Sequence, residues 1–350
     1  MSIRIEENKL LAPLTTLGVG GTARFFVRAE TEADVVEAVE HARKNGLGLF
    51  VLGGGSNVLV SDDGFDGLVL QIAIRGITGG NASVNERAHD TEGTVIAAAG
   101  EDWDEFVRYC VSEDLAGVEC LSGIPGSVGG TPVQNVGAYG HEVSETIVSV
   151  RCLDRGSGEI VTLSNADCGF SYRTSIFNTT ERDRYIVLSA TFRLTRGGAA
   201  KIAYPELERE MAGREGSLKA VREAVLRLRR RKSMVIEEDD PNSRSAGSFF
   251  KNPVVSYDKL DEIRESFENV PFFVFGDRVK IPAAWLIEKS GFAKGFEHGN
   301  AGISANHTLA IVNRGNATAA EIVELKEMIQ ARVAETFAID LHPEPVFIGF

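Results

Sequence analysis

Apolar residues recur at helical spacing in several parts of the chain, and residues suited to begin or end a helix flank them. Thr31 is placed to cap the first of these segments, and Gly46 to end it. The predicted inward faces are Val35, Val36, Val39 and Ala42; Trp103, Phe106, Val107 and Cys110; Val221, Val225 and Leu228; and Ile322, Leu325, Ile329 and Val333. The last segment opens with a capping box from Thr318 to Glu321, and a further helix is expected over 282–291.

Short apolar runs between turn residues predict strands. Such runs occupy residues 47–52, 58–60, 68–74 and 94–100. From 146–154 to 184–194 apolar and polar residues alternate in short runs, which is typical of antiparallel strands. The chain ends in a further strand-like segment over 342–350.

Three consecutive glycines begin the sequence GGGSN at 53–57, between two of the predicted strands. The third glycine position of a dinucleotide fingerprint is occupied by Val58, and a P-loop would end in GK[ST] before a helix. The glycines therefore belong to a bend between strands. A ligand lying against them would be held by backbone N–H groups rather than by a helix dipole.

The segment from Ser122 to Gly140 contains six glycines and no charged residue. A flexible surface loop is one interpretation, but such loops normally carry charge, whereas this one carries Ile124, Val128 and Tyr139. We therefore favour a backbone-lined cradle whose small residues allow a large ligand to approach closely.

Composition and charge narrow the classes of function. A chain of 350 residues with 43% hydrophobic and 25% charged residues is typical of a globular protein of two or three domains. The net charge of −13 disfavours a protein that coats nucleic acid or an anionic membrane. The four cysteines form no CxxC pair, and we expect reduced core thiols and no metal site. The N-terminus shows no signal-peptide pattern, so we expect a cytoplasmic protein.

Three stretches place polar groups among residues that are expected to be buried: FSYRTSIF at 170–177, AGSFFKNP at 246–253 and HPEPVFIG at 342–349. Ser248 lacks a nucleophile-elbow pattern and could simply cap a turn, and Glu344 could be a structural ion-pair partner. At the basic end of the helix predicted over 215–232, Arg227, Arg229 and Arg230 are expected to be solvated.

Five motifs occur in one order along the chain. GGGSN, IPGSVGGTPVQNVGAYG, YRTSIF, AGSFFKNP and PEPVFIG together resemble the UDP-N-acetylenolpyruvoylglucosamine reductase family, and the similarity runs over essentially the whole chain. The family completes UDP-N-acetylmuramic acid for bacterial peptidoglycan, and thereby serves cell wall biogenesis, cell shape and cell division. Tyr204 matches the lid tyrosine of its type I branch.

The resemblance implies an α+β flavoprotein oxidoreductase with the two-part FAD-binding fold of vanillyl-alcohol-oxidase/PCMH-like enzymes. Its first FAD-binding part would span 1–75, and its second 76–231 together with 337–350. A C-terminal α+β substrate-binding domain would span 232–336. FAD would be bound without a covalent bond, and NADPH would be the co-substrate.

The FAD pyrophosphate would lie against the two glycine segments. The resemblance assigns cofactor binding to Gly53, Gly54, Gly55, Ser56, Asn57, Ser122, Gly123, Pro125, Gly126, Gly129, Gly130, Asn135 and Gly137.

The same resemblance assigns the substrate and catalytic residues. NADPH would deliver hydride to the flavin, which would pass it to the enolpyruvyl ether of UDP-N-acetylglucosamine enolpyruvate. Arg173 would stabilise the enolate with Glu344, and Ser248 would protonate the adjacent carbon. Tyr204 and Lys232 would hold the diphosphate, and Tyr172 and Asn252 would line the sugar and uridine pocket. His342 and Pro345 beside Glu344 depart from the family pattern.

Two other functions are alternatives to this one. An FAD-dependent oxidase of the same fold often carries a flavin-linked histidine, and no histidine lies in either glycine segment. A non-catalytic UDP-sugar-binding protein is expected to have lost Ser248, Arg173 or Glu344, and all three are present. We expect a monomer that binds UDP-N-acetylglucosamine enolpyruvate and NADPH, and neither nucleic acid nor membrane.

Overall fold

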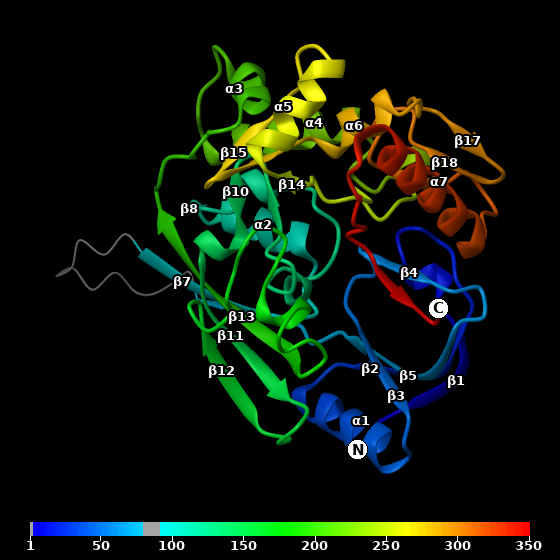
Figure 1. Ribbon diagram of the computed structural model, residues 1–350. Helices are drawn as coiled ribbons and strands as arrows, with labels where there is room; N and C mark the ends of the chain where they lie inside the picture. The colour runs from blue at the N-terminus through cyan, green and yellow to red at the C-terminus, as the bar shows by residue number, and fades with distance from the viewer. Residues whose placement is uncertain (1–2, 80–91) are drawn as a thin grey trace. The chain divides into compact units, whose positions relative to one another are not determined.

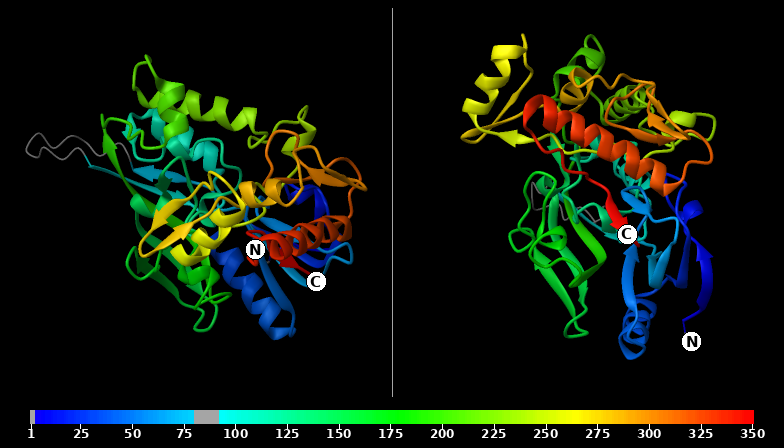
Figure 2. Two further views of the ribbon diagram at one scale, coloured as in Figure 1. Left: turned by 45° about the horizontal axis from the view of Figure 1, so that its top comes forward. Right: turned by 45° about the vertical axis from the view of Figure 1, so that its right-hand side comes forward.

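The computed structural model describes residues 3–79 and 92–350. The chain forms two compact units (Figures 1 and 2). The first comprises residues 1–9, 23–55 and 66–235, and the second comprises 10–22, 56–65 and 236–350. The predicted domain boundaries stay a prediction. Within the described residues, no helix is long and apolar enough to cross a membrane.

A four-stranded sheet in the order β1-β2-β5-β3 includes the strand predicted before GGGSN and the strand predicted over 68–74. Its strands are β1 (Ile5–Leu10), β2 (Thr22–Ala29), β3 (Gly48–Leu52) and β5 (Phe65–Ile72), and β3 pairs with β5 in parallel. Helix α1 (Glu32–Lys44) connects β2 to β3, and Thr31 caps it as predicted. Val35, Ala38 and Ala42 of α1 are buried in the core of the first unit.

A second, antiparallel sheet in the first unit has the order β12-β11-β13-β7-β6, with β8 also paired to β13. Its strands are β6 (Ile77–Gly79), β7 (Glu92–Ala98), β8 (Leu115–Ala116), β11 (Ile147–Asp154), β12 (Ile160–Ser164) and β13 (Tyr185–Arg196). Helix α2 (Trp103–Ser112) buries its predicted face, and the rings of Phe106 and Phe192 lie 4.7 Å apart. This contact secures α2 to the middle strand β13.

Three further elements of the first unit surround the glycine-rich segment. A short hairpin of β9 (Gly137–Ala138) and β10 (His141–Glu142) closes its end. Helices α3 (Pro205–Met211) and α4 (Leu218–Arg231) follow β13 and pack together around Leu207, Val221 and Leu228. The predicted face of α4 is confirmed.

The second unit joins small sheets to one long helix. Its strands are β4 (Val58–Val60), β14 (Val254–Val255), β15 (Phe273–Phe275), β16 (Arg278–Lys280), β17 (Glu297–His298), β18 (Ala301–Ile303), β19 (Ile311–Asn313) and β20 (Val346–Ile348). Its helices are α5 (Tyr257–Ser266), α6 (Ala283–Lys289) and α7 (Ala319–Phe337). The predicted capping box and buried face of α7 are confirmed.

The C-terminal strand pairs with the strand that follows GGGSN. Strand β20 lies parallel to β4, with Val346 opposite Val58 and Ile348 opposite Val60. Both strands belong to the second unit, whereas β3, which precedes GGGSN, belongs to the first. The boundary between the two units therefore falls within GGGSN. Gly53–Gly55 belong to the first unit, and Ser56 and Asn57 to the second.

Candidate active site

Two glycine loops touch in the first unit. An ideal Cβ on Gly54 would lie 2.7 Å from the Cα of Gly126, and one on Gly53 would lie 2.7 Å from Ser127 Oγ. A Cβ atom is not tolerated that close to backbone, so glycine at position 54 is needed for the approach of the two loops. The positive φ of 67° at Gly55 also favours glycine.

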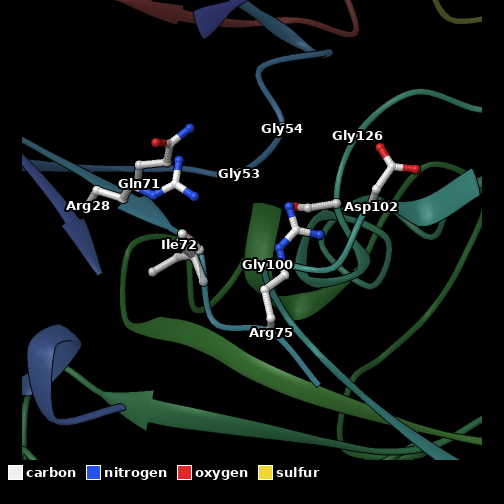
Figure 3. A pocket seen from close by; sticks show the side chains of 11 residues that line it. Arg28, Gly53, Gly54, Gln71, Ile72, Arg75, Gly100, Asp102 and Gly126 are labelled. Atoms are coloured by element: carbon white, nitrogen blue, oxygen red, sulfur yellow. The ribbon is translucent and has the colours of Figure 1, made fainter. Parts of the chain in front are cut away.

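These two loops border a cavity of about 100 Å³ (Figure 3). Its wall is formed by Arg28, Gly53, Gly54, Gln71, Ile72, Ala73, Arg75, Gly100, Asp102, Gly126 and Ser127. The Arg75 guanidinium also pairs with Glu101 at 3.2 Å. Arg28 likewise pairs with Glu30 at 3.2 Å, and Asp102 lies in the same wall. The two guanidinium groups and the backbone of the glycine loops are the groups of this wall that would hold an anion.

The FAD that the resemblance implies fits this cavity in part. The glycines remove side chains from the wall, and Arg28 and Arg75 supply positive charge within an acidic protein. Both features suit a pyrophosphate. A cavity of about 100 Å³ holds only that portion of a dinucleotide.

Helix α2 anchors the second glycine loop. The Gly126 carbonyl accepts a hydrogen bond from Trp103 N at 3.0 Å, and Gly123 N donates to Asp104 Oδ1 at 2.5 Å. Burial opposes ionisation of Asp104, but hydrogen bonds from Arg222 and Gly123 outweigh it and keep the pKa of this carboxyl below its usual value. The anionic Asp104 therefore fixes the start of the loop.

The rest of Ser122–Gly140 is also ordered by internal contacts. Ser122 is fully buried, and its hydroxyl donates to Glu119 O at 2.6 Å. The amide of buried Asn135 donates to Glu142 and to Ser171 O, and accepts from Ser144 N. These contacts exclude the flexible surface loop.

Three other predicted cofactor residues in this segment differ in their surroundings. A Cβ on Gly129 would lie 2.6 Å from that of Ala99, so glycine is required there by packing within the protein. Exposed Gly130 has room for a side chain, since its Cβ would meet only Ser127 Oγ at 4.0 Å. Pro125 is half-buried. Their contacts with a cofactor stay predictions.

One of the three arginines predicted to be solvated is buried. Arg229 is 7% exposed, and it donates to the carbonyls of Gly123 at 3.1 Å and Met234 at 2.7 Å. Burial lowers the pKa of this guanidinium. The prediction for Arg229 is therefore wrong, because its side chain secures the glycine loop instead of facing solvent.

Tyr204 and Lys232 are linked through α3. Tyr204 precedes this helix, and Lys232 Nζ donates to Glu206 in its first turn at 2.5 Å. The Tyr204 ring packs edge-on against Tyr139, with 5.7 Å between centroids. Burial raises the pKa of both phenols, that of Tyr139 to about 12, so both hydroxyls are protonated donors at neutral pH.

A tight turn presents Tyr172 and Arg173. Ser171 and Thr174 exchange backbone hydrogen bonds of 2.9 and 3.0 Å, and Arg173 has a φ of 54°. The guanidinium donates to the Gly137 carbonyl at 2.9 Å and lies over the Tyr172 ring. Arg173 is thus held against the end of the glycine segment.

In the second unit, Ser248 lies beside a histidine that the sequence analysis did not select. Ser248 Oγ and His307 Nε2 are 3.4 Å apart. Glu344 belongs to the same group of loops, because its N–H donates to Phe249 O at 2.9 Å. The side chain of Asn57 donates to the Glu344 carbonyl at 3.1 Å. The structure therefore brings Ser248 and Glu344 together.

The other predicted substrate residue of this unit is Asn252. Its Oδ1 accepts a hydrogen bond from Ala283 N at 2.9 Å, at the start of α6. The amide nitrogen is therefore the part of this side chain that a ligand would use.

The polar side chains in the wall of the glycine cavity were not predicted from the sequence. Arg28 and Gln71 belong to β2 and β5, Arg75 lies between β5 and β6, and nothing in their local sequence distinguishes them. No group of three or more histidine, cysteine, aspartate or glutamate side chains suited to a metal occurs within 3–79 and 92–350. The predicted core thiols are confirmed, since all four cysteines are buried and free.

Comparisons with known proteins match both parts of the chain. Residues 23–164 match the family described as FAD binding domain, and residues 239–348 match the UDP-N-acetylenolpyruvoylglucosamine reductase C-terminal domain. The first range contains both glycine loops, and the second contains Ser248 and Glu344. These matches confirm the predicted fold class.

Relatives that match the chain over nearly its whole length carry the same family name as the C-terminal match. The chain is 46% identical to UDP-N-acetylenolpyruvoylglucosamine reductase of Thermobifida fusca, covering 100% of the chain and 99% of the relative. It is also 46% identical to that of Streptomyces coelicolor, covering 97% and 89%. The crystal structure of the reductase from Thermus caldophilus has a TM-score of 0.66 at 26% identity, covering 99% of each chain. The resemblance carried by the five motifs is therefore confirmed, and the chain belongs to the UDP-N-acetylenolpyruvoylglucosamine reductase family.

Proposed function

We propose that this protein reduces the enolpyruvyl ether of UDP-N-acetylglucosamine enolpyruvate with NADPH, through non-covalently bound FAD, and so forms UDP-N-acetylmuramate for peptidoglycan synthesis. The observation that carries this proposal is the full-length similarity to reductases named for the activity. Within the match to an FAD-binding domain, two glycine loops border a cavity that is also lined by Arg28 and Arg75.

Bound FAD supplies the hydride carrier between NADPH and the alkene carbon remote from the substrate carboxylate. The backbone of Gly53, Gly54 and Gly126 would hold the pyrophosphate, and Arg28 and Arg75 would add positive charge. The tight contact of the loops requires glycine at position 54, so this part of the wall carries no side chain.

Side chains of the protein stabilise and then protonate the negative charge that hydride addition creates. Arg173 is always cationic and planar, so it stabilises the enolate carboxylate, with Glu344 as its polarising partner. Ser248 donates the proton that the adjacent carbon requires. The hydrogen bond of Arg173 to Gly137 O restricts its guanidinium before substrate binds.

Four side chains are assigned to the UDP portion of the substrate. Lys232 and the protonated hydroxyl of Tyr204 hold the diphosphate. Tyr172 and the amide nitrogen of Asn252 line the sugar and uridine pocket.

Cysteine burial and net charge bear on where the protein works. Four free, buried cysteines favour a reducing compartment, and the enzyme works in the cytoplasm as a monomer. It requires neither membrane nor nucleic acid, in agreement with the net charge of −13.

Anaerobic incubation with NADPH and the enolpyruvyl UDP-sugar tests the function. We expect one NADPH oxidised for each UDP-N-acetylmuramate formed, measured by absorbance and mass spectrometry. NADPH oxidation that needs oxygen and leaves the UDP-sugar unchanged would instead identify an oxidase.

Replacing Lys232 with alanine is expected to weaken binding of the UDP-sugar about tenfold or more, the cost of losing a charged hydrogen bond. The loss also leaves Glu206 without this partner, and its charge then repels the diphosphate. Titration of the oxidised flavin spectrum measures the affinity. Arg230→Ala on the same helix is the control, because removal of an exposed charge changes affinity less than about twofold. Equal small effects in both variants would remove Lys232 from the site.

A further inference from the structure

His307 lies beside Ser248 in the second unit, and we infer that it orients the Ser248 hydroxyl and restores its proton after each turnover. The distance of 3.4 Å between Nε2 and Oγ is that of a long hydrogen bond. Catalytic hydrogen bonds are often long before ligand binds and shorten in the complex. The inference rests on the proposed role of Ser248 as proton donor.

Backbone contacts fix the two residues as a pair. Phe249 N, next to Ser248, donates to Leu309 O at 2.7 Å. Ala310 N donates to His307 O at 3.1 Å, which holds the histidine in a turn before β19. Gly247, with a φ of 73°, turns the chain just before Ser248. The serine and histidine therefore stay adjacent without depending on long side chains.

The hydroxyl of Ser248 has one hydrogen, so the direction of its hydrogen bond with His307 decides whether that hydrogen is available to the substrate. If Ser248 donated that hydrogen to His307, none would point toward the substrate. If Nε2 carries the hydrogen, it donates to Oγ, and the serine O–H is left for the ligand. The same hydrogen bond stabilises the negative charge that develops on Oγ as the proton leaves. Only the second arrangement serves proton donation.

The proton transfers balance without further reactants. The Oγ–H bond of Ser248 breaks as the new carbon–hydrogen bond forms. With a hydrogen on both ring nitrogens, the Nε2–H bond of His307 then breaks as Oγ–H is restored, and a neutral imidazole is left. Its Nε2 takes up one proton from solvent, which is the proton that the overall reduction consumes. No electrons move in these two steps, so the hydride and this proton complete saturation of the alkene. His307 acts through Ser248 and is a positioning residue.

Rapid-mixing experiments on His307→Ala test this role. We expect near-parental reduction of the bound flavin by NADPH, and reoxidation by the enolpyruvyl UDP-sugar about 10²-fold slower. Binding of the UDP-sugar to the oxidised protein should stay near the parental affinity. Added imidazole should restore much of the reoxidation rate, since it can occupy the space of the lost ring. His298→Ala is the matched control, because that histidine pairs with Glu324 at 3.1 Å in the same unit.

Two further variants separate proton transfer from a structural effect. His307→Gln retains an N–H donor but cannot relay a proton, so its rate should lie between those of the parent and His307→Ala, without imidazole rescue. Ser248→Ala/His307→Ala should be no slower than Ser248→Ala, because His307 acts only through the serine. A slower double variant would overturn the inference.

The outcome for the parent protein separates this inference from the proposed function. A parent that the UDP-sugar cannot reoxidise would refute the function itself. If the parent is reoxidised and His307→Ala reacts at the parental rate, only the role of His307 is refuted. If His307→Ala is slow, and neither imidazole nor the glutamine side chain raises its rate, His307 supports the loops alone and the inference fails.

Discussion

Replacing Ser248 with alanine is expected to leave flavin reduction by NADPH near the parental rate, and to slow reoxidation by the enolpyruvyl UDP-sugar about 10²-fold or more. The two half-reactions differ because only saturation of the alkene leaves a carbanion that must be protonated. Ser248 lies beside His307 and, through Phe249, beside Glu344, in loops joined by backbone hydrogen bonds. Stopped-flow absorbance of the flavin follows each half-reaction separately.

Substrate binding gives the control for Ser248→Ala. The oxidised flavin spectrum should shift on titration with the UDP-sugar much as in the parent, because the hydroxyl is assigned to proton donation rather than to affinity. Thr308→Ser alters a neighbouring hydroxyl residue of the same loops and should leave both rates within about twofold, as expected for a substitution that keeps the hydroxyl. Reoxidation of Ser248→Ala at the parental rate would make Ser248 a turn residue, and another group would have to supply the proton.

Replacing Gly54 with alanine is expected to weaken FAD binding about 100-fold or more. The new Cβ would lie 2.7 Å from the Cα of Gly126 and 3.0 Å from Ser127 N, so one loop must move. Displacement of a binding group by about 1 Å can cost a factor of this size. Flavin content per protein, read from the absorption spectrum after dialysis, measures the loss. Gly216→Ala is the control, since nothing lies within 4 Å of its Cβ.

A second glycine separates loss of cofactor from loss of folding. Gly130 has room for a larger side chain within the protein, so Gly130→Val should fold normally by circular dichroism and still lose FAD if the cofactor lies against it. Full flavin content in both Gly54→Ala and Gly130→Val would refute the cradle. Gly129→Val is less informative, because the new side chain collides with Ala99.

Helices with a continuous buried face were predicted well from the sequence. The inward residues of α2, α4 and α7 are buried, and the caps at Thr31 and Thr318 form as expected. Helices α3 and α5 were not predicted, since each buries only two side chains. Such segments become helical mainly through their tertiary contacts.

The error at Arg229 has a specific physical origin. Arg229 follows Val225 by four residues and therefore lies on the same face of α4 as that buried valine. The prediction relied on the charge of Arg229 and not on its position along the helix. A buried guanidinium is tolerated here because the carbonyls of Gly123 and Met234 accept its hydrogen bonds.

The candidate site was predictable only where it is local in sequence. The glycine loops could be recognised from composition, because glycine is what a close backbone approach requires. The pairing of Ser248 with His307 joins residues 59 positions apart, and no spacing rule predicts such a contact. The arginines at the glycine cavity likewise meet through the pairing of distant strands.

Reoxidation of the reduced parent protein tests the central claim most directly. The purified protein should be yellow, with one FAD per chain, and one equivalent of NADPH should bleach it under anaerobic conditions. Addition of UDP-N-acetylglucosamine enolpyruvate without oxygen should then restore the oxidised flavin spectrum and yield UDP-N-acetylmuramate in equal amount. A protein that stays bleached with the UDP-sugar and regains its colour only with oxygen would contradict the account.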